Sequence, residues 1–268
     1  DAACSTLGAG VICSGQVQAQ GGQAGGMSVC TDTPISHPKL ILSPHVVQNR
    51  WLLQGVTIAG GASIQWFAST FGAKQAEKLA TSGPALYQYI SEEAEASSVG
   101  ANGIIFLPYL QGERSPLWDS EAKGVYFGFG LHNTHADFVR ATMEGVAYSL
   151  RHNLDIALQT GIVISEIYAT DGSANSRIWT QIKADVVGIP IYVRNTSSTA
   201  WGAAMLAGIG AGVFADAASA VAQSRKNCHA VYPIAEHKGL YDRLFEIYKE
   251  LYHQTKSSMH SLSKLAVQ

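Results

Sequence analysis

The segment Glu166–Asp185, EIYATDGSANSRIWTQIKAD, predicts a short strand, then a loop of small residues, then a helix. Ile167 and Tyr168 suit a strand, and apolar residues recur at helical spacing from Ile178 onward. A small-residue loop at a helix N-terminus offers free backbone N–H groups and the positive end of the helix dipole. Such a loop suits a phosphate or the edge of a nucleotide, although a plain tight turn has the same pattern.

The composition is that of a globular protein with a large core. Apolar residues make up 47% of the 268 residues and charged residues 14%, which excludes a disordered chain. At this length one or two domains are expected. The net charge is −2 and no cluster of lysine or arginine is present, so the sequence predicts no nucleic-acid partner.

Cysteine and histidine positions favour a cytoplasmic protein without a metal centre. The four cysteines show neither metal-ligand spacing nor a disulfide framework, which predicts reduced thiols. His132 and His135 have no third ligand near them, and a solvated loop and helix start is the preferred interpretation. No apolar run is long enough to cross a membrane and no signal peptide is visible, so no membrane partner is predicted.

Outside the opening segment, short strands alternate with helices, which is an α/β pattern. Strands are expected near residues 16–20, 27–30, 40–42, 56–58, 104–107, 124–129 and 189–193. Helices are expected near residues 1–12, 60–71, 84–96, 135–160, 200–212, from 216 and over 236–253. The polar tail Gln254–Gln268 is expected to fray. The apolar side of the long helix 135–160 favours burial in the core over a groove for a partner.

Several segments together resemble the C-terminal half of the FGGY family of carbohydrate kinases. Phe106–Gly128, FLPYLQGERSPLWDSEAKGVYFG, looks like the family's signature loop, and Gly60–Phe67, GGASIQWF, is similar to the helix start that borders the nucleotide. Asp171–Asp185 resembles the adenosine loop, and Thr199–Gly208, TAWGAAMLAG, resembles the helix after it. The resemblance implies an α/β, actin- and hexokinase-like (ribonuclease H-like) ATPase domain, with a mixed sheet and helices on both faces.

The resemblance also implies a domain organisation. Residues 1–268 would form the C-terminal, nucleotide-binding domain, and the N-terminal, sugar-binding half would be absent. The chain opens on Asp1 without an initiator Met, which we interpret as the start of a fragment of a longer polypeptide. The isolated chain is therefore expected to be inactive, because it lacks the other wall of the active-site cleft.

Asp1 falls where the family has the aspartate of its GGxD motif, the proposed catalytic base. Such a carboxylate would accept the proton of the sugar hydroxyl as that hydroxyl attacks the γ-phosphate of ATP. Without the resemblance, an N-terminal Asp is interpreted as a helix N-cap.

The same comparison assigns nucleotide contacts to the glycine-rich turn and the following helix. Gly22, Gln23 and Gly25 occupy the second phosphate motif, in which Gln23 replaces a hydroxyl residue. A glutamine can still hydrogen-bond a phosphate, but its side chain is larger. Gly61 and Gln65 match positions that contact the nucleotide.

In the adenosine loop, Gly172 and Ser173 match a glycine pair. A serine is tolerated at the second position only if its φ is negative. Ser176 and Arg177 fall where the family places polar contacts to adenine or ribose. Within the signature loop, Glu113 and Arg114 are expected to form a surface ion pair that supports the loop's shape rather than contacting the sugar.

The function implied is that of an ATP-dependent sugar kinase, with xylulose or a related pentulose as the preferred substrate and gluconate or glycerol as alternatives. Mg²⁺ would bridge the phosphates, and closure of two domains would align sugar and γ-phosphate. No GxxxxGK[ST] motif is present, which argues against a P-loop enzyme. A non-catalytic regulator that binds nucleotide or sugar, and an oligomerisation module or homodimer paired through the long helix, remain open alternatives.

Overall fold

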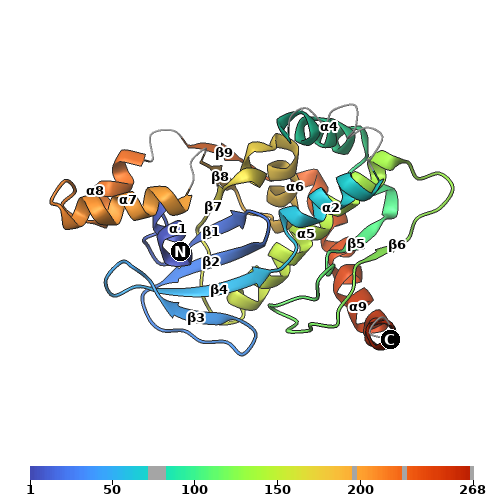
Figure 1. The fold of residues 1–268 in the computed structure, drawn as a ribbon, viewed down its shortest axis with the longest axis horizontal. Helices are drawn as coiled ribbons and strands as arrows, with labels where there is room; N and C mark the ends of the chain where they lie inside the picture. Colours follow the sequence, from blue (N-terminus) through green and yellow to red (C-terminus); the bar gives the residue numbers. More distant parts are fainter. Residues whose placement is uncertain (72–82, 195–197, 225–227, 266–268) are drawn as a thin grey trace.

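The computed structural model describes residues 1–71, 83–194, 198–224 and 228–265 (Figure 1). Within them, a mixed sheet has the strand order β3-β4-β2-β1-β7-β8-β9. Its central strand β1 (Gln16–Gly21) pairs antiparallel with β2 (Gly25–Thr31) and parallel with β7 (Glu166–Thr170). The sheet extends through β4 (Trp51–Thr57) and β3 (Ile41–Pro44) on one side, and through β8 (Ile191–Val193) and β9 (His229–Val231) on the other.

Alternating side chains of β1 give the sheet two different faces. Val17 and Ala19 lie in an apolar core with residues of α5 (His135–Leu158) and α6 (Arg177–Val187). On the opposite face, the Gln18 amide donates to Ser5 Oγ of α1 (Ala2–Gly8) at 2.7 Å. Helices therefore cover both faces of a mixed sheet, as the sequence predicted (Figure 1).

The remaining elements surround this sheet. A two-stranded sheet joins β5 (Ile105–Leu107) and β6 (Val125–Phe127), and short 3-10 turns are η1 (Ala101–Gly103) and η2 (Gly172–Asn175). The other helices are α2 (Gly61–Phe71), α4 (Gly83–Ala96), α7 (Ser198–Gly210), α8 (Ala217–Ser224) and α9 (Ala235–Leu265). The sequence analysis missed β9, and α5 is buried along most of its length, which confirms the prediction that it belongs to the core.

The prediction that the tail after Gln254 frays is wrong for its described part, because α9 continues to Leu265. Met259 is only 2% exposed and packs in the same core as α5. His260 Nε2 lies 2.8 Å from Asp119 Oδ2, and Ser263 Oγ donates to the Glu121 carbonyl at 3.2 Å. The signature loop thus gives the polar end of the helix partners that its own sequence does not reveal.

The expected surface ion pair of Glu113 and Arg114 is also wrong, although the loop-supporting role is confirmed for Glu113. Glu113 is buried, whereas Arg114 is exposed. Glu113 Oε1 accepts hydrogen bonds from the backbone N–H groups of Ile58 at 3.0 Å and Arg114 at 2.8 Å. Burial raises the pKa of this carboxyl to about 8. The side chain therefore fastens the signature loop to the end of β4 from inside the protein.

Replacing Met259 should show whether the C-terminal end of α9 is packed on the core or frayed. We expect Met259→Ala to lower the free energy of unfolding by ~2–4 kcal/mol, because it opens a cavity in the core. Leu262→Ala, at a position that is 60% exposed on the same helix, should change it by less than ~0.5 kcal/mol. Chemical denaturation of both variants measures the difference, and equally small effects would show that this end of the helix does not dock.

Glu113→Gln should change the pH dependence of stability. The folded pKa is raised above the value in the unfolded chain, so the stabilising contribution is complete below pH 4.5 and is lost as pH rises through about 8. Between these pH values we expect the free energy of unfolding of wild type to fall by up to about 1.4 kcal/mol per pH unit relative to that of the variant. The amide of the variant keeps the Oε1 acceptor. Urea unfolding from pH 5 to 8.5 measures this, with the exposed Glu95→Gln as control. Parallel curves for wild type and Glu113→Gln would contradict it.

Candidate functional site

The tip of the β1–β2 hairpin lies directly against the start of α2, backbone to backbone. The N–H of Gly61 donates to the Gly22 carbonyl at 3.0 Å, and the N–H of Ala62 donates to the Gln23 carbonyl at 3.0 Å. A Cβ on Gly61 would lie 2.6 Å from the Gly22 carbonyl oxygen, and one on Gly60 would lie 2.6 Å from the Gly25 nitrogen. Glycine is required here by the close approach of two main chains.

The loop after β7 forms the second side of the site. Asp171 has φ 68°, after which the chain turns through η2 and Ser176 begins α6, accepting a hydrogen bond from the Trp179 N–H. Ser173 is not among the residues with positive φ, which satisfies the condition predicted for a serine at this position. The strained residue of the loop is Asp171 instead, whose carboxylate accepts from Thr170 Oγ1 at 3.0 Å.

The loop and the hairpin meet at Ser173. A Cβ on Gly21 would lie 1.6 Å from Ser173 Oγ, so the serine hydroxyl occupies the space that a side chain on β1 would need. Behind it, Lys183 Nζ donates to Ser173 Oγ at 2.6 Å and lies 4.5 Å from the centre of the Trp179 ring. Burial lowers the pKa of the Lys183 amine to about 7.

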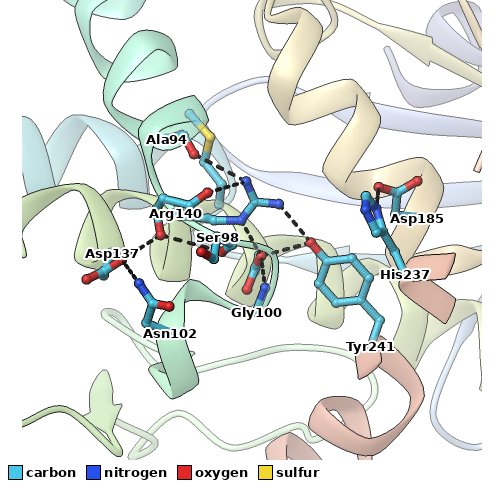
Figure 2. Close-up of polar contacts among 12 residues, drawn as sticks. Ala94, Ser98, Gly100, Asn102, Asp137, Arg140, Asp185, His237 and Tyr241 are labelled. Carbon is cyan, nitrogen blue, oxygen red and sulfur yellow. Dashed lines mark hydrogen bonds and ion pairs between the residues drawn. The ribbon is translucent and has the colours of Figure 1, made fainter. Parts of the chain in front are cut away.

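Helix α4 forms the third side and is positioned by a buried arginine (Figure 2). Arg140 Nη1 donates to the carbonyls of Ala94 and Ser97, both at 3.2 Å, at the C-terminal end of α4. The same guanidinium donates to Glu144 Oε1 at 2.8 Å and to Tyr241 Oη at 3.1 Å. The position of α4 therefore depends on an ion pair within α5 and on a tyrosine of α9.

These three sides enclose a cleft of about 790 Å³. That volume lies within the usual range for small-molecule sites. The cleft is lined by Gly21, Gly22, Gln23, Gly61, Ile64, Gln65, Tyr87, Gln88, Ile90, Ser91, Met143, Gly172, Ser173, Asn175, Ser176, Arg177 and Trp179. Arg177 is the one charged side chain among the described lining residues.

The structure brings most of the predicted site residues together. Every predicted nucleotide contact lines the cleft except Gly25, which lines a small adjoining cavity of about 20 Å³. Asp1 lines neither space. Its exposed carboxylate accepts a hydrogen bond from the Ala2 N–H at 2.6 Å and caps α1, the role that the residue type alone suggests.

Sequence reasoning missed the contribution of α4 and of Lys183. The helix itself was predicted over 84–96, but nothing in its pattern places Tyr87, Gln88 and Ser91 at the cleft. Ser91 Oγ lies 2.9 Å from Ser176 Oγ, and this contact joins α4 to the end of the loop after β7, 85 residues later in the sequence. Only tertiary packing creates that contact.

The site combines two kinds of surface. Ile64, Ile90, Met143 and Trp179 provide apolar lining for a flat hydrophobic group. Glycines of the hairpin and of the loop after β7 place backbone at the cleft, and the N-terminus of α6 brings the positive end of a helix dipole there, which suits an anion. In the described part of the chain, no three His, Cys, Asp or Glu side chains are grouped so that they could hold a metal ion. None of the described helices has the length and apolar character needed to cross a membrane.

The fold defines an α/β domain of the actin- and hexokinase-like class, with a cleft where loops at the ends of strands meet helices. The xylulose kinase of Rhodospirillum rubrum superimposes with a TM-score of 0.83 and 29% identity, over 97% of this chain and 51% of that one. This match confirms the fold predicted from the sequence.

Residues 24–211 match the model of the FGGY family of carbohydrate kinases, C-terminal domain. The xylulose kinase of Staphylococcus epidermidis is 33% identical over 259 residues, 96% of this chain and 50% of that protein. The gluconokinase of Bacillus licheniformis is 28% identical, over 94% of this chain and 49% of that protein. The chain belongs to the FGGY family of carbohydrate kinases and spans about half the length of the curated relatives it matches.

Two glycine substitutions should show which glycine is required by close backbone packing and which one borders open space in the cleft. Gly61→Ala places a methyl group against a backbone carbonyl and should lower the free energy of unfolding by ~1–3 kcal/mol. A Cβ on Gly172 meets only the Gly21 carbonyl oxygen, at 3.9 Å, so Gly172→Ala should change stability by less than ~0.5 kcal/mol. Denaturant titrations of both variants compare them, and a neutral Gly61→Ala would contradict the packing of hairpin on helix.

Proposed function

We propose that residues 1–268 form the nucleotide-binding domain of an ATP-dependent carbohydrate kinase, with the sugar-binding half in a separate N-terminal part. The observation that carries this proposal is the cleft, where a hairpin, a helix start and a loop from distant parts of the sequence meet. Each of these segments resembles a nucleotide-binding motif of the family. We further propose xylulose or a related pentulose as the sugar, supported by the similarity to the xylulose kinase of Staphylococcus epidermidis, with gluconate or glycerol as alternatives.

In this proposal the two glycine loops hold the phosphates. Gly22, Gln23 and Gly25 would present backbone N–H groups from the hairpin, and Gly172 and Ser173 would do so from the loop after β7. Bare backbone at these points allows phosphate oxygens to approach closely. The exposed side chain of Gln23 would reach the phosphates from the mouth of the cleft.

The base and ribose would lie on the other side of the cleft. Gln65, Ser176 and Arg177 offer polar groups, while Ile90 and Trp179 offer apolar surface for the adenine ring. Ser176 also caps α6 and contacts Ser91, so its hydroxyl would hold the cleft together as well as contact the ligand.

Mg²⁺ would be brought in by the nucleotide. The described lining of the cleft presents no carboxylate that would hold the ion by itself, which fits a cation bound chiefly through phosphate oxygens and water. When bound, it would neutralise charge on the transferred phosphoryl group.

Asp1 would be the general base. Its carboxylate is exposed at the start of α1, so a sugar held by the N-terminal half could approach it. It would accept the proton of the attacking hydroxyl, and domain closure would bring that hydroxyl in line with the γ-phosphate. We expect no sugar phosphorylation by the isolated chain, because one wall of that arrangement is missing.

The cysteines and the burial of α5 bear on where the protein is located and how it could dimerise. We place the protein in the cytoplasm, since its donor would be ATP and its four cysteines are free thiols. A homodimer would need a surface other than α5, because α5 is buried along most of its length.

Calorimetric titration with Mg-ADP tests the nucleotide site. We expect wild type to bind, Gln65→Ala to bind ~3–10-fold more weakly through one lost hydrogen bond, and Gly172→Val to bind at least ~10-fold more weakly because valine fills the cleft. Gly239→Val, in open space on α9, is the matched control and should bind like wild type.

Two outcomes would contradict the proposal. Equal affinity in all four proteins would place the nucleotide outside this cleft. Absence of binding at millimolar Mg-ADP, both for this chain and for a version extended by the N-terminal half of a family member, would show that the cleft does not take a nucleotide.

A further inference from the structure

A buried cation without a counter-charge lies behind the loop after β7. Lys183 is 5% exposed, and its ammonium donates to a neutral partner, Ser173 Oγ, at 2.6 Å. Its other close neighbour is the Trp179 ring, at 4.5 Å. Among the ion pairs of the described residues, none includes Lys183.

The lysine lines the small cavity that adjoins the cleft. At about 20 Å³ this cavity has room for roughly one water molecule. Gly21, Gly25 and Gly61 line it, and Ser173 lines both this cavity and the cleft. The ammonium therefore sits directly behind both glycine loops.

Among the described residues that line this cavity, Lys183 is the one titratable group. Helix α5 presents Val146 and Leu150, strand β4 presents Thr57, and β1 presents Gln20 to the cavity. An isolated buried charge in such surroundings is costly. Burial accordingly lowers the pKa of this amine to about 7, so close to neutral pH it carries its charge only part of the time. A permanent anion nearby would remove that cost.

We propose that Lys183 is a positioning residue for the phosphate groups of a nucleoside di- or triphosphate. Its ammonium holds Ser173, and with it the loop after β7, against the hairpin, and it supplies positive charge from behind the backbone N–H groups that face the ligand. This inference rests on the proposed function of the cleft and adds a residue to it. The comparable cation in the cleft lining, Arg177, is exposed, so screening by solvent weakens its attraction for the ligand.

The role predicts proton uptake on binding. A phosphate ligand favours the charged amine, so the pKa of Lys183 is higher in the complex than in the free protein. The affinity gained from the charge is complete below the free pKa of about 7 and is lost as pH rises through the higher pKa of the complex. Mg-ADP should therefore bind more weakly at pH 9 than at pH 7, by up to about tenfold per pH unit.

The experiment compares Mg-ADP with adenosine, which has no phosphate, on wild type, Lys183→Met and Ser173→Ala at pH 7, 8 and 9. Titrations in two buffers of different protonation enthalpy report the protons taken up. We expect Lys183→Met to bind Mg-ADP weakly, without pH dependence or proton uptake, and to bind adenosine like wild type. Ser173→Ala should lose affinity but keep proton uptake. The exposed Lys238→Met on α9 is the control and should match wild type throughout.

A stability measurement shows that the variant folds. Because the folded pKa of the amine is lowered, wild type gains stability as pH rises from about 7 towards 10.5. Lys183→Met should therefore be more stable than wild type at pH 7, and the difference should disappear at high pH.

The outcomes distinguish this inference from the proposed function. Mg-ADP binding with the same affinity and pH profile in wild type and Lys183→Met would overturn the inference and leave the nucleotide site standing. Equal loss of adenosine and Mg-ADP in the variant would show a purely structural lysine and would also overturn it. Binding of neither ligand by wild type, both as this chain and as the version extended by an N-terminal half, would overturn both.

Discussion

Main chains that touch without side chains between them hold the candidate site together. The hairpin and the start of α2 approach so closely at Gly60 and Gly61 that no Cβ fits, and at Gly21 the Ser173 side chain of the loop after β7 fills the space that a Cβ would need. The first N–H groups of α2 are bonded to hairpin carbonyls, so the hairpin completes the helix as well as bordering the cleft. These contacts join three segments that are distant in the sequence into one floor of the cleft.

Much of the fold follows from local pattern, and the exceptions have tertiary causes. Alternation predicted β1, helical spacing predicted α5 and α6, and the small-residue loop between β7 and α6 was visible in the composition. Strand β9 was missed because three residues, His229–Val231, carry no usable period. The end of α9 was mispredicted because its partners, Asp119 and Glu121, belong to a loop more than a hundred residues earlier in the sequence.

The candidate site likewise combines features that the local sequence predicts with features that only tertiary packing explains. Its glycine-rich turn and small-residue loop were visible in the sequence, and the resemblance to the family assigned nucleotide contacts to them. Glu113 was expected at the surface because charged residues usually lie there. Its burial is explained only by the hydrogen bonds that it accepts from two backbone N–H groups. The position of α4 had no local signal, since it depends on Arg140, Glu144 and Tyr241, which come together only in the folded core (Figure 2).

Two of the buried cations in this protein have opposite electrostatic circumstances. Arg140 is surrounded by a carboxylate, a phenol and two carbonyls, so its charge is satisfied within the fold and helps to specify one arrangement of α4, α5 and α9. Lys183 has one neutral hydroxyl and an aromatic ring. A fold gains nothing from a charge that it leaves uncompensated, and an apolar residue of similar length would fill the same space at lower cost. The position of this lysine behind two glycine loops is therefore better explained by the proposed phosphate ligand than by the stability of the domain.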